Sequence, residues 1–504
     1  MLEQYVKRVL SARVYDVAVE SPLEAARQLS ERTGARVLLK REDLQAVHSF
    51  KLRGAYNRMA ALTAAERDRG VIAASAGNHA QGVALAAGRL SLQATVVMSV
   101  NTADIKSNAV RALGARVILA GDTYDDAARH AQMLAQRDAL TFVHPYDDVD
   151  VIAGQGTIGM ELLRQHQGAI DAIFVPVGGG GLIAGIGAYV KYLRPQTRIV
   201  GVEAEGSACL AAALAAGRRV RLPTDELDLF ADGVSVAQVG REPFRIARRC
   251  VDEVITASAD EICAAVKDLF DDTRAIAEPA GALALAGLKK YAENGRATGK
   301  TLIAIVSGAN VNFDRLRYIS ERAEVGERRE AIFAVTIPEQ PGSFRRFCRS
   351  IGKRNVTEFN YRIAPGREAE VFVGVSVRNA DDRHAFAEAL RTHGYESEDM
   401  TDNEMAKQHV RHMVGGRAPL ADEVVYSFRF PERPGALMRF LDVAGSRFNI
   451  SMFHYRNHGA ASGRVLTGFQ VPAPQRREFR KALSAIGYPF SDESTNSAYQ
   501  RFLR

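Results

Sequence analysis

Residues 172–193 read AIFVPVGGGGLIAGIGAYVKYL, and this stretch decides the fold class. A continuous apolar run, typical of a buried strand, leads into four consecutive glycines and then into a helical pattern. Glycines without Cβ atoms let backbone N–H groups converge on an anion, and the start of a helix adds its positive dipole end. A tight turn from strand to helix needs one or two glycines, so Gly178, Gly179, Gly180 and Gly181 predict a phosphate-binding loop.

The same glycines fit a second interpretation. Gly179 to Ala184 satisfy the pattern GxGxxA, and Glu203 ends the next predicted strand, 24 residues after Gly179. This is the dinucleotide fingerprint, in which the acidic residue binds a ribose hydroxyl. An NAD-dependent oxidoreductase with amino-acid-sensing tail domains is therefore the competing hypothesis, and other residues must decide between the two.

The first 320 residues alternate short β-branched runs with Ala- and Leu-rich helical patterns. Such alternation predicts a parallel sheet covered by helices on both faces, and the number of strands exceeds one nucleotide-binding unit. We therefore predict a two-lobed α/β catalytic part over residues 1–320. The predicted strands start at Arg36, Gly70, Ala94, Ala115, Ala172, Arg198 and Thr301.

The remainder of the chain repeats itself. Residues 337–347 (IPEQPGSFRRF) align with residues 430–440 (FPERPGALMRF), with six identities in eleven positions at an offset of 93. Each copy reads strand, helix, two strands, helix and strand, which is the ferredoxin-like βαββαβ unit. The predicted parts are a charged linker at 321–330, a first domain at 331–403, a connecting segment at 404–423 and a second domain at 424–504.

Composition excludes several classes of protein. The net charge is +7, of which residues 331–504 carry +6, with 25 Lys or Arg against 19 Asp or Glu in alternation. This alternation predicts a solvated face and not a nucleic-acid surface. No apolar run approaches the ~20 residues of a membrane span. The four cysteines, Cys209, Cys250, Cys263 and Cys348, lie far apart, so we expect free thiols and a cytoplasmic protein.

Three further motifs carry polar groups at the ends of predicted strands or the starts of helices. In SFKLRGA, Lys51 follows Phe50 and a predicted N-cap at Ser49, which suggests a buried amine with a lowered pKa that could form a Schiff base. SAGNHAQG begins at Ser75 and SGAN begins at Ser307. Ligands of open α/β sheets bind at the carboxyl ends of the strands, so these motifs point to one cleft.

Taken in order, SFKLRGA, SAGNHAQG, GGGGL and SGAN resemble the fold-type II pyridoxal phosphate enzymes. With the two C-terminal repeats, the whole chain resembles the biosynthetic threonine deaminases (threonine ammonia-lyases), in which two ACT-like regulatory domains follow the catalytic part. The resemblance implies pyridoxal 5'-phosphate as cofactor. It also implies conversion of L-threonine to 2-oxobutanoate and ammonia, the first committed step of isoleucine synthesis.

The resemblance also implies a role for each motif. Lys51 would bind the cofactor covalently and act as catalytic base, and Phe50 would pack on the cofactor ring. Asn78 would bind the phenolic oxygen, and Ser307 would face the pyridine nitrogen. Ser75 would receive the substrate carboxylate. The cofactor phosphate would be held by Gly178, Gly179, Gly180, Gly181 and the Leu182 amide.

Regulation and assembly follow from the same resemblance. Isoleucine would inhibit and valine would relieve inhibition, both bound between or beside the ACT-like domains, and the protein would be a homotetramer. Related enzymes carry a metal near the glycine loop, for which Glu203, Ser207 and Cys209 are the candidates here. A cysteine in place of an oxygen ligand argues against a hard cation, so we predict no metal site.

Overall fold

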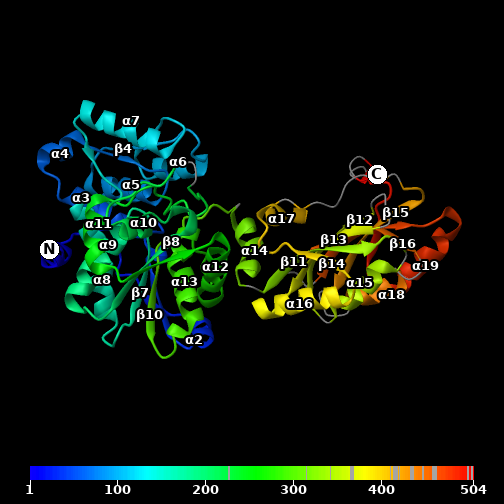
Figure 1. The fold of residues 1–504 in the computed structure, drawn as a ribbon. Helices are drawn as coiled ribbons and strands as arrows, with labels where there is room; N and C mark the ends of the chain where they lie inside the picture. Colours follow the sequence, from blue (N-terminus) through cyan, green and yellow to red (C-terminus); the bar gives the residue numbers. More distant parts are fainter. Residues whose placement is uncertain are drawn as a thin grey trace. The chain divides into compact units, whose positions relative to one another are not determined.

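The chain forms two compact units, Met1–Gly326 and Glu327–Arg504, in a computed structural model (Figure 1). Within the described residues no helix is long and apolar enough to cross a membrane. The structure describes all residues except 225, 226, 314, 328, 341, 353, 364–367, 409, 413–417, 419, 432–435, 445–447, 457–461, 497, 498, 501, 502 and 504.

The first unit is built on a six-stranded sheet in the order β1-β2-β10-β7-β8-β9. All neighbours are parallel except β1, which pairs antiparallel with β2 at the edge. The strands are β1 (Leu23–Ala25), β2 (Arg36–Arg41), β7 (Ala172–Pro176), β8 (Arg198–Ala204), β9 (Glu253–Ala257) and β10 (Thr301–Val306).

A second, four-stranded parallel sheet in the order β5-β4-β3-β6 forms the smaller lobe of this unit. The two sheets confirm the predicted two-lobed α/β architecture, and the predicted strands are all present. The strands of the smaller lobe are β3 (Val71–Ala74), β4 (Ala94–Met98), β5 (Arg116–Leu119) and β6 (Thr141–Phe142).

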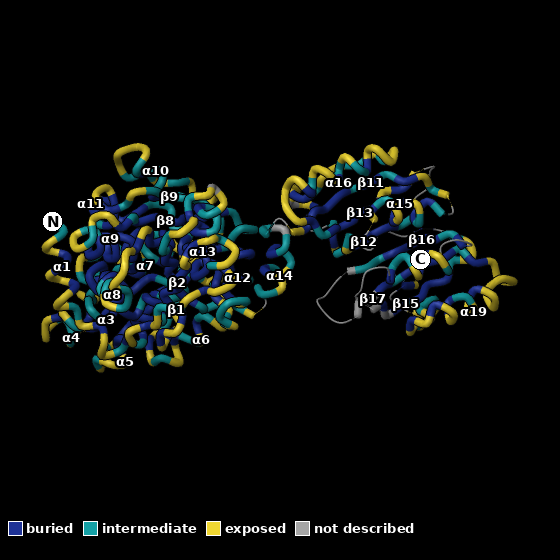
Figure 2. The backbone as a smooth tube through the Cα atoms, turned by 90° about the horizontal axis from the view of Figure 1, so that it is seen from below, coloured by how far each residue is buried: buried dark blue, intermediate teal, exposed yellow. Residues whose placement is uncertain are grey.

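Helices cover both faces of the six-stranded sheet because alternate strand residues are apolar on each side. Phe174 and Val202 pack on one face with α12 and α13, whereas Ile173 and Ile199 pack on the other with α8 and α9. Figure 2 shows these strands as the buried interior of the unit. The α-helices are α1 (Leu2–Leu10), α2 (Arg27–Thr33), α3 (Lys51–Ala60), α4 (Ala64–Arg69), α5 (Asn78–Leu90), α6 (Asp104–Ala112), α7 (Tyr124–Arg137), α8 (Val149–Gln165), α9 (Gly181–Leu193), α10 (Cys209–Ala216), α11 (Arg241–Cys250), α12 (Ala259–Thr273), α13 (Pro279–Tyr291) and α14 (Arg315–Gly326).

Short helical turns complete this unit. They are η1 (Glu42–Leu44), η2 (Glu205–Ser207) and η3 (Ala292–Arg296). Helix α14 continues to Gly326, and the first strand of the second unit starts at Glu330, so most of the charged stretch 321–330 is helical.

The second unit contains one eight-stranded antiparallel sheet in the order β14-β11-β13-β12-β16-β17-β15-β18. Each βαββαβ copy supplies four neighbouring strands, and the copies join where β12 pairs antiparallel with β16, Asn360 opposite His454. The elements are β11 (Glu330–Pro338), α15 (Ser343–Ile351), β12 (Val356–Arg362), β13 (Glu368–Ser376), α16 (Ala380–Thr392), β14 (Glu396–Asp399), α17 (Glu404–Gln408), η4 (Val410–His412), β15 (Glu423–Pro431), α18 (Ala436–Val443), β16 (Asn449–Arg456), β17 (Ser462–Gln470), η5 (Ala473–Gln475), α19 (Arg476–Ile486) and β18 (Phe490–Asp492).

One hydrophobic core spans both copies. Phe347 of α15 and Phe479 of α19 pack in it with the central pair Phe359 and Phe453. The two copies therefore share a single core, as expected for paired ferredoxin-like domains. The Pro-Gly pair that precedes the second copy's first helix, at 434–435, lies outside the described residues.

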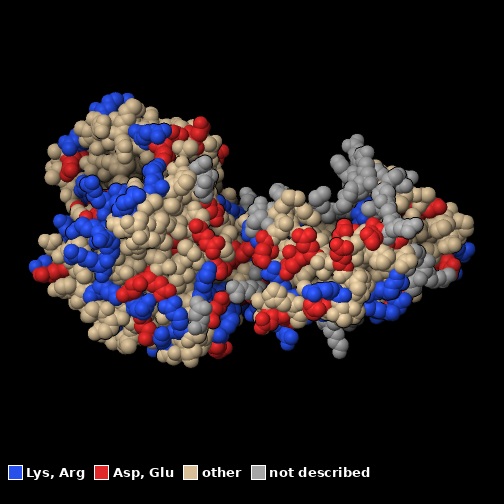
Figure 3. All heavy atoms as spheres, viewed as in Figure 1, with Lys and Arg blue, Asp and Glu red and all other residues tan. Residues whose placement is uncertain are grey.

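Surface charges of the second unit are mixed. On the face in Figure 3, basic and acidic side chains are interspersed and form no continuous basic stripe. Arg345 pairs with Asp442 at 2.5 Å, and Arg476 lies 3.6 Å from Asp422. These arginines belong to a solvated face of mixed charge.

Candidate active site

Lys51 is the first residue of α3 and faces the interior of the first unit. Its Nζ donates to the backbone carbonyl of Pro145 at 3.2 Å. Burial lowers the pKa of the Lys51 amine from 10.5 to about 8, while the negative charge of Glu278 acts in the opposite direction. At neutral pH a usable fraction of this amine is therefore unprotonated, which an exposed lysine is not.

The prediction that Ser49 caps α3 is wrong. Phe50 occupies the N-cap position with helical backbone angles, and no side chain caps the helix. Residues 48–50 instead pair with the loop after β10: Phe50 N–H donates to the Ser307 carbonyl and Ser49 bridges Gly308. This pairing leaves the buried Ser49 Oγ without a partner among the described residues. It also places Ser307 beside the start of α3.

The start of α5 lies against the start of α3. Asn78 is the first residue of α5, and one turn later a Cβ at Gly82 would lie 3.0 Å from the Leu52 nitrogen and 3.1 Å from the Lys51 carbonyl carbon. This close approach brings Ser75 and Asn78 to the region of Lys51. Ser75 Oγ accepts a hydrogen bond from the Gly77 N–H at 3.2 Å, which shapes the loop before the helix.

Asn78 belongs to a partly buried chain of hydrogen bonds that the sequence did not reveal. Its Nδ2 donates to Glu278 Oε1 at 2.6 Å, and its Oδ1 accepts from Asn310 Nδ2 at 2.7 Å. Asn310 Nδ2 also donates to the Val47 carbonyl at 2.8 Å. Burial raises the pKa of Glu278 to about 7. The SGAN loop thus reaches Asn78 through its last residue.

The glycine loop between β7 and α9 cannot carry side chains. A Cβ at Gly179 would lie 2.2 Å from the Tyr146 ring, one at Gly178 would lie 2.9 Å from Val234 Cα, and Gly180 has φ +88°. The N–H groups of Gly178, Gly179 and Gly180 donate to no group in the described part of the chain. Free donors at the start of a helix are what a phosphate needs. The loop therefore fits the phosphate of the expected cofactor.

Ser307 lies at the end of β10 and is almost fully buried. Its hydroxyl donates to the Ala280 carbonyl at 3.2 Å, so the group is neutral and hydrogen-bonded. The Ala280 carbonyl, and not a carboxylate, holds the Ser307 hydroxyl in place. Phe50, directly before Lys51, is buried in the same core as Ile303 and Ile305 of β10.

Glu203, whose position suggested contact with a ribose hydroxyl or a cation, is bound to the backbone of its own segment. Its two carboxylate oxygens each accept at 2.8 Å from the N–H groups of Leu210 and Ala211, so it binds the start of α10. Burial raises its pKa to about 7. Cys209 Sγ contacts the Gly178 carbonyl at 3.5 Å, and its thiol pKa is raised. Glu203 therefore holds the start of α10, and Cys209 contacts the glycine loop.

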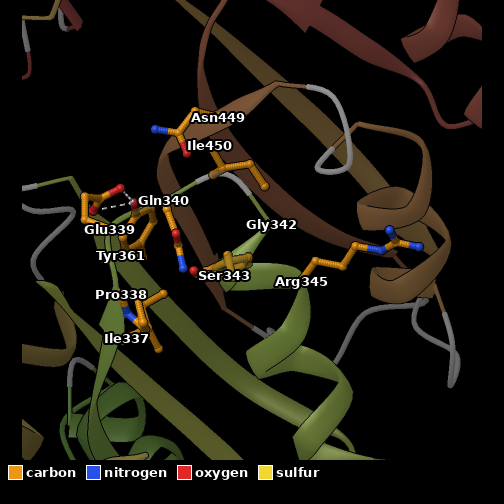
Figure 4. Close-up of a pocket in the computed structure, with 11 residues that line it drawn as sticks. Ile337, Pro338, Glu339, Gln340, Gly342, Ser343, Arg345, Tyr361, Asn449 and Ile450 are labelled. Atoms are coloured by element: carbon orange, nitrogen blue, oxygen red, sulfur yellow. Dashed lines mark hydrogen bonds between the residues drawn. The ribbon is translucent and has the colours of Figure 1, made fainter. Parts of the chain in front are cut away.

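A second site lies in the other unit, between the end of β11, the start of α15 and the start of β16 (Figure 4). The Tyr361 hydroxyl contacts both Glu339 oxygens at 2.8 and 2.9 Å, and burial raises the pKa of Glu339. Asn449 and Ile450 come from the second copy and close the pocket. The niche at the junction of the two copies is small, about 10 Å³, and is lined by the Glu339 carboxylate together with Ile337 and Ile450.

Comparisons with known proteins agree with this geometry. Residues 15–308 match the family described as pyridoxal-phosphate dependent enzyme. Residues 321–410 and 414–503 each match the C-terminal regulatory domain of threonine dehydratase. The biosynthetic L-threonine dehydratase IlvA of Burkholderia multivorans is 56% identical over 503 residues, 99% of both chains.

The chain belongs to the biosynthetic threonine dehydratases. The counterpart from Escherichia coli K12 in this threonine dehydratase family is 52% identical over 503 residues, 99% of this chain and 97% of its own. The structure of processed threonine deaminase isoform 2 from Solanum lycopersicum covers 64% of this chain and 93% of its own, with 49% identity and a TM-score of 0.62. Membership of this family overturns the alternative of an NAD-dependent oxidoreductase.

Several residues of the site were missed by reasoning from the sequence alone. Glu278, Pro145 and Tyr146 stand in no recognisable motif and reach the site from distant segments. Asn310 was within the SGAN motif, but its partner could not be inferred. The sequence did contain a signal for Glu278. This acid directly precedes Pro279, a residue type typical of the first position of a helix, and so occupies the N-cap position.

Proposed function

We propose that the enzyme converts L-threonine to 2-oxobutanoate and ammonia, with Lys51 as the reacting amine. Loss of water across Cα and Cβ leaves aminocrotonate, which tautomerises to an imine, and water then hydrolyses the imine to 2-oxobutanoate and ammonia. The observation that carries this proposal is Lys51, a half-buried lysine with a pKa near 8 beside Asn78, the SGAN loop and the start of α5. A general base works best when its pKa lies near the working pH.

The cofactor would be held by the residues that the motifs suggested. Lys51 would bind its aldehyde carbon, Asn78 its phenolic oxygen and Ser307 its ring nitrogen, with Phe50 against the ring. The phosphate would be bound by Gly178, Gly179, Gly180, Gly181 and the Leu182 N–H. When bound, pyridoxal phosphate supplies the electron sink that acidifies the Cα proton of an amino acid.

Lys51 then carries the proton chemistry. Its amine removes the Cα proton of threonine, and the Pro145 carbonyl holds the resulting ammonium in place through the observed contact. The same ammonium is positioned to return a proton to the departing β-hydroxyl, so that water leaves. Ser75 and the N–H groups at the start of α5 bind the substrate carboxylate, which fixes the Cα–H bond towards Lys51.

Ser307 favours elimination over amino transfer. A carboxylate at the ring nitrogen would keep that nitrogen protonated and the ring a deep electron store, whereas the Ser307 hydroxyl is neutral. Negative charge at Cα is then better discharged by expelling the hydroxyl group at Cβ. Serine, which lacks only the methyl group, would be a poorer substrate by a modest factor, because one methyl group contributes ~1–3 kcal/mol to binding.

The second unit would sense the end product of the pathway. We propose that isoleucine inhibits and valine relieves inhibition by binding at the junction of the two copies. There Glu339 would pair with the effector ammonium, and Ile337 and Ile450 would contact its side chain. Domains at 331–403 and 424–504, joined by 404–423, would form this sensor. We also propose that the protein is cytoplasmic and forms a homotetramer. Light scattering of the purified protein tests the tetramer.

Lys51→Ala tests the proposed reaction. The purified variant should fold, lose pyridoxal phosphate absorbance and lose at least about 1000-fold in turnover of threonine to 2-oxobutanoate, because both base and attachment point are removed. Lys7→Ala, which removes an exposed ammonium of α1, is the matched control and should keep both. Undiminished turnover in Lys51→Ala would refute the assignment.

A further inference from the structure

Glu278 is a buried acid for which the proposed reaction has no use. It directly precedes α13, where a side chain often accepts from the first helical turn, yet it forms no such bond. The residue is only 5% exposed, and its carboxylate is turned to Asn78 at 2.6 Å. Among the described residues no lysine or arginine forms an ion pair with it. A buried unpaired carboxylate is costly, so its position calls for a reason.

The contact fixes the orientation of the Asn78 amide. Asn78 Nδ2 faces the Glu278 oxygen and Oδ1 faces the Asn310 amide nitrogen. Rotating the amide by 180° would place oxygen against oxygen and nitrogen against nitrogen. Above its pKa of about 7 the Glu278 carboxylate only accepts hydrogen bonds, so it enforces this orientation more strictly than a hydroxyl would. The other N–H of Asn78 Nδ2 has no partner among the described residues and can bind a ligand.

The surroundings of Glu278 also define its electrostatic effect. The neighbouring charges are Asp232, which disfavours ionisation, and Lys106, which favours it; these two form an ion pair at 2.5 Å. The Asn310 backbone N–H supports the ionised form as well. On the other side lies Lys51, whose protonated form the Glu278 charge stabilises.

We propose that Glu278 is a positioning residue: its carboxylate locks the Asn78 amide so that one N–H faces the cofactor oxygen, and it places a negative charge beside Lys51. It touches neither substrate nor cofactor and acts through these two side chains. Gly308 makes room for it, since a Cβ at Gly308 would lie 2.7 Å from Glu278 Oε1. This inference depends on the role proposed above for Lys51.

Two variants separate the hydrogen bond from the charge. Glu278→Gln keeps an oxygen that accepts from Asn78 but has no charge, whereas Glu278→Ala loses both. We expect the dissociation constant of pyridoxal phosphate, from titration of the apoprotein, to rise about 10-fold or more in Glu278→Ala and about 3-fold or less in Glu278→Gln.

A measurement on the apoprotein tests the effect of the Glu278 charge on Lys51. Acylation of Lys51 in the apoprotein by an amine-reactive reagent, followed across pH by peptide mass spectrometry, should show its midpoint at lower pH in both variants. Removing a nearby negative charge destabilises the ammonium, which gives this sign. Asp268→Asn, which removes a buried carboxylate between Arg32 and Lys289, should lower thermal stability and leave both readouts unchanged.

If the pH midpoint of Lys51 acylation is the same in Glu278→Gln as in the wild type, the inference is overturned. This result decides the question even if Glu278→Ala does not fold. Unchanged cofactor affinity in a folded Glu278→Ala overturns the positioning of Asn78. Failure of the underlying function is distinguishable. If the reduced holoprotein carries the cofactor elsewhere than Lys51, the reaction mechanism fails, whereas attachment at Lys51 with wild-type behaviour of the Glu278 variants refutes this inference alone.

Discussion

Lys51 owes its reactivity to where its side chain is held. The pKa is lowered because burial penalises the ammonium, and Glu278 moderates the effect. An amine of pKa near 8 is about one-tenth neutral at pH 7, whereas an exposed lysine is neutral to less than about 0.1%. This neutral fraction supports the proposal that Lys51 is the amine that reacts with the cofactor aldehyde.

The rate of cofactor binding should depend on pH in a corresponding way. Only the neutral amine reacts, so the association rate of pyridoxal phosphate with the apoprotein should rise about 10-fold from pH 7 to pH 9 and then level off. Stopped-flow absorbance measures this rate. A continued rise of about 100-fold over the same range would indicate an unperturbed lysine and contradict the lowered pKa.

At the scale of elements, the loop from β7 to α9 has two structural roles. It offers N–H donors, and it lets Tyr146 and Val234 pack directly on its backbone. The sequence indicated the donors, because four glycines between a strand and a helix have few other uses. It could not indicate the packing, since Tyr146 comes from a separate segment.

Gly179→Ala should weaken binding of pyridoxal phosphate by about 10-fold or more, because the new methyl group would lie 2.2 Å from the Tyr146 ring and push the loop apart. Equilibrium titration measures the effect. Gly88→Ala is the control: it lies within α5 with its nearest contact at 3.7 Å, and should stabilise the protein by about 0.5–1 kcal/mol. Equal affinity in Gly179→Ala and wild type would count against the loop as phosphate site.

Secondary structure was largely predictable, whereas the side-chain network was not. Continuous apolar runs such as Ala172–Pro176 allow few alternatives to a buried strand, and the repeat at an offset of 93 placed the ferredoxin-like elements. The prediction of a Ser49 cap was wrong because Ser49 pairs with Gly308, a tertiary contact that local capping preferences do not describe. Glu278 and Asn78 are 200 residues apart in the chain, and no local pattern encodes their contact.

On the scale of the whole molecule, each of the two units has its own core. The first contains both sheets of the catalytic part, and the second contains a single sheet shared by two copies. Pairing of β12 with β16 makes the second unit one continuous body. A ligand at the junction can therefore change both copies together.

Removal of residues 327–504 should leave an enzyme that turns over threonine but does not respond to isoleucine. The pocket proposed for the effector is lost, while the sheets around Lys51 stay complete. Initial rates with and without isoleucine measure this, and allosteric couplings usually change affinity ~5–150-fold. In the full chain, Glu339→Gln should weaken inhibition without loss of basal rate. Undiminished inhibition of the truncated enzyme would place the effector site in the first unit.

The central claim concerns one covalent bond. Borohydride reduction of the holoprotein, followed by peptide mass spectrometry, should locate the pyridoxal phosphate adduct on Lys51 and on no other lysine. An adduct on a different residue, or none in a protein that still deaminates threonine, would contradict the account.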